Sequence, residues 1–154
     1  SVLFAKTMAA LGLDPTYGAY LGQLPGVTLA TVNLMSGFGL HRRRRGAIVG
    51  HLAGFEMTSS IPNRRYGNAL RRLGYGREAT HFFDEHVEAD AVHENIAAWD
   101  LAGGLAAEEP RVAADVLFGT RALLQVEARW AAHLIEAWER GESSLLSPGM
   151  AIAA

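Results

Sequence analysis

The segment FFDEHVEADAVHE, residues 82–94, carries three polar side chains whose types and spacing allow them to act together. His86, Asp90 and His93 are separated by four and three residues, so they lie on one face of a helix. Phe82 and Phe83 share that face and mark it as the side packed into the core. Imidazole and carboxylate groups on a buried face point to a metal site, because unpaired polar groups are costly to bury.

Two glutamates interrupt apolar lines on other predicted helices. Glu56 lies on one line with Leu52 and Ser59, and Glu127 lies on the line of Leu123 and Trp130. Burying one unpaired carboxylate costs several kcal/mol, against a total stability of about 5–15 kcal/mol. Such groups must therefore pair, accept hydrogen bonds or bind a cation. A single histidine on an apolar face is more typical of a hydrogen-bonded core residue, but this set favours a metal.

The spacing also bears on how many ions would bind. His86 and Asp90 are one helical turn apart and are close enough to share an ion. His86 and His93 are two turns apart, about 10 Å along the axis, which favours two ions with Asp90 between them. Imidazole with carboxylate suits iron or manganese, and zinc is a further option. The H-E-x-x-H signature of zinc proteases is absent.

Helical periodicity dominates the chain and strand signals are almost absent, which predicts an all-α helical bundle. The pattern predicts helices over about 1–12, 27–38, 41–60, 62–73, 77–102 and 109–140, and a short helix after Asp14-Pro15. Pro62 is expected to separate two of these helices, and Gly103-Gly104 to end another. We expect one domain over residues 1–141, followed by a C-terminal tail over 142–154.

Three glycines form a ridge without side chains on the predicted 41–60 helix. Gly46, Gly50 and Gly54 recur every four residues. Because glycine costs about 1 kcal/mol in an exposed helix, the ridge predicts that another helix packs very close to it. The ridge and its apolar surroundings are also compatible with a homodimer.

The composition narrows the range of partners and locations. The chain has 154 residues, 14 basic and 16 acidic side chains, and a net charge of −2, which gives no case for nucleic acid or an anionic membrane. The arginine run HRRRRG lacks interleaved aromatic residues, so we interpret it as a solvated surface patch. No apolar stretch reaches the roughly 20 residues of a membrane span. The lack of cysteine is compatible with the cytoplasm, which is the location we expect.

The residues singled out above resemble a known family. Glu56, followed after thirty residues by His86-x3-Asp90-x2-His93, is similar to the heme-oxygenase-like diiron oxidases, also described as iron-containing redox enzymes. The resemblance extends through GHLAGFEMTSSIPNRRYGNALRRLG (50–74) and FFDEHVEADAVHENIAA (82–98) to nearly the whole chain. It implies a seven-helix fold like that of heme oxygenase and a pair of non-heme irons that activates O2. The implied substrates are small molecules of the amino acid, amine or fatty acid type.

By position, the resemblance makes Glu56 the carboxylate ligand of one helix and makes His86, Asp90 and His93 the ligands of another. The catalytic residues stay unassigned. Glu127 is a candidate to accept a hydrogen bond from a ligand histidine, and a salt bridge to a neighbouring arginine is the alternative. Arg64 and Arg65 are candidates to hold a substrate carboxylate, with exposed helix-start arginines as the alternative.

One part of the family pattern does not appear. The family's first ligand-bearing helix supplies a Glu and a His, and residues 1–55 contain only one acidic residue, Asp14. We therefore expect the missing pair just before Ser1, in a chain that begins within a longer protein. With four of the ligands, this chain would bind one ion or none, and the alternative function is a metal-free helical partner module of the same fold.

Two other functions of this fold are less favoured. A thiaminase-type enzyme uses a cysteine nucleophile, and the chain has none. A heme-binding oxygenase would need a histidine on the first helix, where none is present.

Overall fold

The computed structural model describes residues 2–147, and these form a bundle of helices without a strand. The helices are α1 (Val2–Ala10), α2 (Gly26–Gly39), α3 (Arg45–Arg72), α4 (Arg77–Asn95), α5 (Gly104–Glu108) and α6 (Ala113–Glu139). A π-helical segment, Ile96–Gly103, joins α4 to α5, and short 3₁₀ turns cover Leu21–Gln23, Arg42–Arg44 and Pro110–Val112. The predicted all-α class is confirmed. Residues 148–154 of the predicted tail lie outside the described residues.

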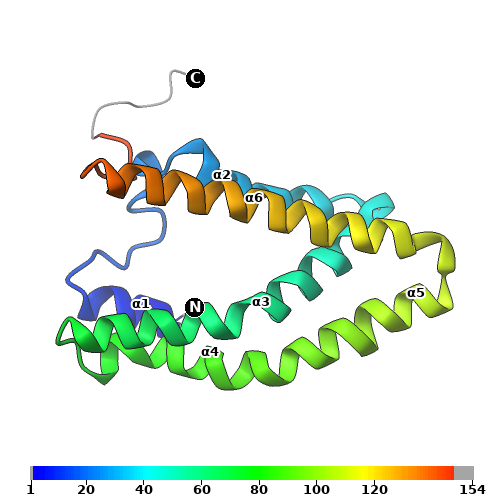
Figure 1. Ribbon diagram of the computed structural model, residues 1–154, viewed down its shortest axis with the longest axis horizontal. Coiled ribbons are helices and arrows are strands. Elements are labelled where there is room, and N and C mark those ends of the chain that lie inside the picture. Colours follow the sequence, from blue (N-terminus) through cyan, green and yellow to red (C-terminus); the bar gives the residue numbers. More distant parts are fainter. Residues whose placement is uncertain (1, 148–154) are drawn as a thin grey trace.

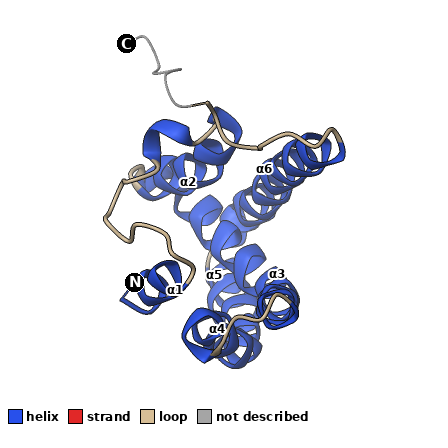
Figure 2. Cartoon of the chain, turned by 90° about the vertical axis from the view of Figure 1, so that its left-hand side faces the viewer, coloured by secondary structure: helices blue, strands red, loops and turns tan. Residues whose placement is uncertain are grey.

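The long helix α3 is the centre of the bundle. It packs against α4 along one side and against α6 on the other, while α1 lies on α4 and α2 lies beside α6 (Figures 1 and 2). Figure 1 shows that α3 and α6 meet toward one end of the molecule and spread apart toward the other. The side of α3 that faces α6 is therefore in contact with it toward one end of the molecule and separated from it toward the other.

The glycine ridge lies where α3 and α6 meet. A Cβ atom at Gly50 would lie 1.8 Å from the carbonyl oxygen of Val116, and one at Gly119 would lie 1.9 Å from that of Ala47. The hydroxyl of Thr120 donates a hydrogen bond of 2.7 Å to the carbonyl oxygen of Gly50 across the same contact. The predicted close approach of another helix is confirmed, because only a missing side chain lets the two backbones come this near.

The predicted helix break at Pro62 is wrong. α3 runs without interruption from Arg45 to Arg72, and Pro62 lies inside it. Proline removes one backbone hydrogen bond and bends a helix, but it does not end one that is held by its packing against a neighbouring helix, here α4. Figure 1 shows α3 changing direction near its middle.

Two other predicted boundaries are also wrong. Helical structure continues past Gly103-Gly104 to Glu108, after a change from α-helical to π-helical geometry at Ile96. The segment after Asp14 forms turns instead of a helix, and the Asp14 carboxylate accepts a hydrogen bond of 2.9 Å from the backbone N–H of Thr16. This local bond gives the chain an alternative to helix formation.

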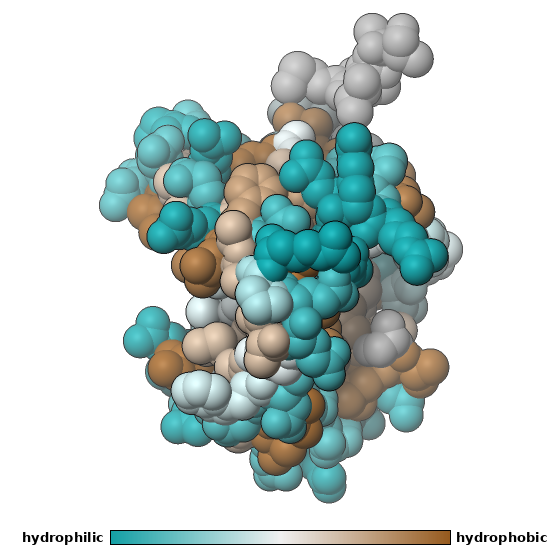
Figure 3. Space-filling model, turned by 90° about the vertical axis from the view of Figure 1, so that its right-hand side faces the viewer, coloured by the Kyte–Doolittle hydropathy of each residue, from teal (hydrophilic) through white to brown (hydrophobic). Residues whose placement is uncertain are grey.

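The side chains of Arg42, Arg43 and Arg44 in the arginine run are exposed. Figure 3 shows one end of the molecule, where hydrophilic side chains are interrupted by apolar ones. Arg45 forms an ion pair with Glu109, and the guanidinium of Arg44 lies 5.9 Å from the ring centre of Phe118. These contacts agree with the interpretation of the run as a surface patch.

Within residues 2–147, no helix is both long enough and apolar enough to cross a membrane. The described part of the predicted tail contacts the helical body, since the backbone N–H of Leu146 donates a hydrogen bond of 2.8 Å to the carbonyl oxygen of Gln23. The division at residue 141 stays a prediction.

Candidate metal centre

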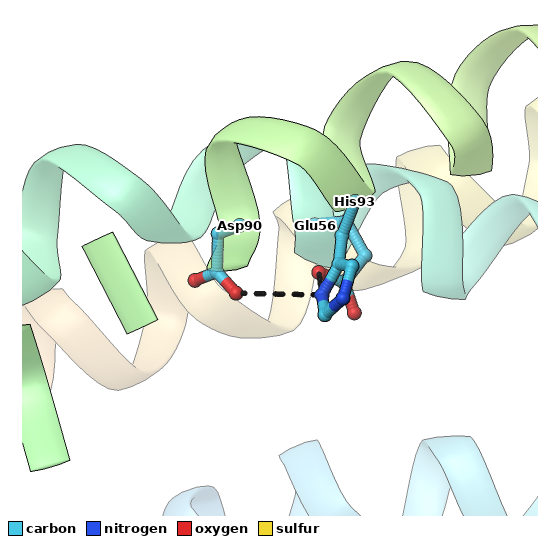
Figure 4. A group of neighbouring side chains, drawn as sticks. All are labelled: Glu56, Asp90 and His93. Carbon is cyan, nitrogen blue, oxygen red and sulfur yellow. Dashed lines mark ion pairs between the residues drawn. The ribbon is translucent and has the colours of Figure 1, made fainter. Parts of the chain in front are cut away.

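Three of the four predicted metal ligands lie together between α3 and α4. Ligand atoms of Glu56, Asp90 and His93 all lie within 4.8 Å of one another. The Nδ1 atom of His93 is 3.5 Å from Oε2 of Glu56 and 3.9 Å from Oδ1 of Asp90. Figure 4 shows the three side chains turned toward one another, with Glu56 coming from α3 and the other two from α4.

The Asp90 carboxylate is the most enclosed member of the group. The residue is 4% exposed. Its Oδ2 atom accepts hydrogen bonds from the hydroxyl of Ser59 at 2.6 Å and from the side-chain amide of Asn63 at 3.2 Å. Both donors come from α3, and they compensate for the loss of water around a buried carboxylate. They leave Oδ1 facing His93.

The centre is accessible from one side. The His93 side chain is 54% exposed and that of Glu56 is 19% exposed. Both residues line a cleft of about 270 Å³, together with Leu52, Ile96, Ala97 and Leu101. The group therefore opens onto a cleft whose other walls are apolar.

His86, the fourth predicted ligand, is not within this group. Its Nδ1 atom lies 2.6 Å from the carbonyl oxygen of Phe82, and its ring lies 4.1 Å from the Phe82 ring, centre to centre. The hydrogen bond requires the proton on Nδ1, which leaves Nε2 as the nitrogen able to bind a metal. A backbone carbonyl that accepts from the other ring nitrogen is the usual way in which a ligand histidine is oriented.

Glu127 on α6 is partly buried, and burial raises the pKa of its carboxyl group above the ordinary value. Among the described residues, no side chain donates a hydrogen bond to it, and no arginine lies within salt-bridge distance. Neither of its two predicted roles is thus seen. Arg64 and Arg65 are exposed on α3 and do not line the clefts that contain Glu127.

Two polar residues near the centre were not identified from the sequence as part of it. The sequence pattern puts Ser59 on the line of Glu56 without indicating a role for it, and it puts Asn63, one turn beyond Ser59, in the separate helix predicted over 62–73. The periodicity of α3 would have found Asn63 if Pro62 had been read as internal to the helix. A third residue, His51, is buried, and its Nε2 atom has no hydrogen-bond partner among the described residues.

The donor set fits iron. Two ligand atoms that each lie about 2.1 Å from one ion are at most about 4.2 Å apart, so the separations of 3.5 and 3.9 Å already fall within that range. Carboxylate oxygens with an imidazole nitrogen are the donors that iron and manganese take in proteins. The chemistry and the geometry of the group therefore agree with the metal that the resemblance implies.

Comparison with known proteins identifies the family of the chain. A sequence model of the family described as iron-containing redox enzymes matches residues 1–128, which include all four predicted ligands. No curated protein and no solved structure matches the chain. The match covers most of the chain and confirms the resemblance, the heme-oxygenase-like helical fold and a general iron redox function. The chain belongs to the iron-containing redox enzyme family.

Proposed function

We propose that the protein uses iron and O2 to oxidise a small organic substrate, with Glu56, Asp90 and His93 as iron ligands. The observation that carries the proposal is the convergence of these three side chains from two helices in a member of an iron redox family. Carboxylate and imidazole donors leave iron able to react with O2, which is the chemistry that the metal supplies when it is bound.

The residues around the iron would each have a distinct part. The Ser59 hydroxyl and the Asn63 amide hold Oδ2 of Asp90, so that Oδ1 stays directed at the metal. The Phe82 carbonyl fixes the ring of His86 and leaves Nε2 free to bind. Leu52, Ile96 and Leu101 give the opening an apolar wall, against which the apolar part of a substrate would pack.

We further propose that the intact protein binds two irons, with His86 binding the second one. The two-turn separation of His86 and His93 and the position of Asp90 between them support this number. A homodimer and a cytoplasmic location stay predictions.

The proposal is tested by loading the protein with Fe(II) under anaerobic conditions and measuring the iron bound per chain. We expect Glu56→Ala and His93→Ala to lower the iron affinity by more than about 100-fold. Loss of a residue that only hydrogen-bonds to a metal ligand already costs about 10–100-fold, and loss of the ligand itself should cost more. In the intact protein, His86→Ala is expected to lower the number of bound irons from two to one. Glu88→Ala, at an exposed position of α4, is the matched control and should bind iron as the parent does.

Two outcomes would contradict the proposal. Iron binding by the Glu56 and His93 variants equal to that of the parent would show that the group is not the metal site. Failure of a normally helical parent protein to bind iron would favour the metal-free partner module.

A further inference from the structure

A cleft of about 540 Å³ opens between α2, α3 and α6, and Glu56 is one of the residues that line it. Its volume is within the range of small-molecule sites in proteins. Most of its wall is apolar, and the lining residues of this kind are Val32, Met35, Ile48, Leu52, Phe55 and Leu123. The cleft is therefore suited to a ligand with a hydrocarbon body.

The polar groups of the same wall carry no positive charge. They are Thr31, His51, Glu56 and Glu127, and no lysine or arginine among residues 2–147 lines the cleft. The Thr31 hydroxyl already donates a hydrogen bond of 2.8 Å to the carbonyl oxygen of Thr28. Burial lowers the pKa of His51, so this side chain is neutral at pH 7. The charge of the wall comes from carboxylates alone.

Glu127 connects this cleft to a second one of about 540 Å³, which lies where α3 and α6 spread apart. Phe55, Leu123 and Glu127 line both clefts, and the second adds the rings of Tyr66 and Trp130. A carboxylate among aromatic rings is the arrangement that recognises organic cations, because the ring faces also attract positive charge. The Glu127 carboxylate has no partner among the described residues to compete for it.

The charge of the ligand's polar group follows from these walls. An anionic group would meet two carboxylates and no cation, which is repulsive in an apolar setting. A neutral group would leave the buried carboxyl group of Glu127 without a charged partner. A cationic nitrogen would pair with Glu127 and let its hydrocarbon chain occupy the apolar wall toward Glu56.

We propose that this cleft binds an elongated apolar molecule with one cationic nitrogen, an alkylammonium or amidinium, and that Glu127 forms the ion pair with that nitrogen. As a statement about the substrate, this rests on the proposed function, because Glu56 lines both the cleft and the metal centre. As a statement about binding, it holds for the protein without metal. Glu127 is then a residue that selects amines over carboxylic acids.

The test titrates n-octylammonium, octanoate and 1-octanol into the full chain at pH 7 in the presence of a chelator, and follows binding by ¹⁵N NMR shifts. The chelator prevents octanoate from binding through iron, and it separates this test from the iron-loading experiment. We expect octylammonium to bind at least about tenfold more tightly than octanoate, with shifts in α2, α3 and α6.

Two variants assign the selectivity to one carboxylate. Glu127→Gln should lower the affinity for octylammonium by about tenfold and change the affinity for octanol by no more than about twofold. Glu136→Gln, at an exposed position of α6, should change neither. Octanoate binding equal to octylammonium binding in the unaltered protein would overturn the proposal, whether or not Glu127→Gln folds. An unchanged octylammonium affinity in a folded Glu127→Gln variant would overturn it as well.

Discussion

The hydroxyl of Ser59 on α3 donates a hydrogen bond of 2.6 Å to the buried carboxylate of Asp90 on α4. We expect Ser59→Ala to destabilise the metal-free protein by about 1–3 kcal/mol, because a buried acceptor loses a donor and only Asn63 remains. It should also weaken iron binding by about tenfold, since outer partners orient metal ligands. Urea denaturation and Fe(II) titration measure the two effects.

The neighbouring serine provides the control for this change. The Ser60 hydroxyl is buried without a hydrogen-bond partner among the described residues. Ser60→Ala should therefore leave stability unchanged or raise it slightly, and should not alter iron binding. Equal losses in both variants would show that the Ser59 hydrogen bond is not specific to the centre.

Alanine should have opposite effects at two helical glycines, one at the crossing of α3 and α6 and one away from it. Gly50→Ala should destabilise the protein by about 3 kcal/mol or more, because its Cβ would overlap the Val116 carbonyl group and the backbones must separate. Gly37→Ala in α2 should stabilise it by about 0.5–1 kcal/mol, because nothing lies within 4 Å of its Cβ position. Thermal or urea unfolding of the two variants checks the sign of each change, and a tolerated Gly50→Ala would contradict the observed crossing.

His51 makes stability depend on pH. Burial lowers the pKa of its side chain in the folded protein, so the unfolded chain binds the proton more readily. Stability from this group is present above the unfolded pKa of about 6.5 and is lost as the pH falls toward the folded pKa. We expect His51→Leu to be less sensitive to the change from pH 7.5 to pH 5.5 than the parent, as measured by urea midpoints at both values. An identical pH dependence in the two proteins would contradict this.

Glu127 makes stability depend on pH in the opposite direction to His51. Burial raises the pKa of its carboxyl group, so the folded protein holds the proton at a pH where the unfolded chain has lost it. The contribution of this group to stability is therefore highest below the unfolded pKa and falls as the pH rises through the folded pKa. In the parent, Glu127 lowers the urea midpoint at pH 7.5 relative to that at pH 4.5. We expect Glu127→Gln to remove this part of the pH dependence. Added octylammonium should raise the parent's midpoint at pH 7.5 more than that of the variant.

The sequence by itself determined which side chains share a helix face. The spacing of His86, Asp90 and His93 and the line of Glu56 and Ser59 follow from the 3.6-residue turn, which is a local property of the backbone. The glycine ridge likewise predicted a close helix contact, because glycine destabilises a helix and three in one line therefore indicate that a neighbouring helix needs the space. These inferences needed no knowledge of the partners.

The tertiary structure alone decided which faces meet. It brought Glu56 to Asp90 and His93, turned His86 onto the Phe82 carbonyl, and placed Glu127 on two clefts without a partner among residues 2–147. It also carried α3 through Pro62, which put Asn63 beside Asp90. The reason is that a proline acts on one turn, whereas α3 is held by its packing against α4 and, toward one end, against α6. Contacts between distant segments depend on that packing, and no local pattern encodes it.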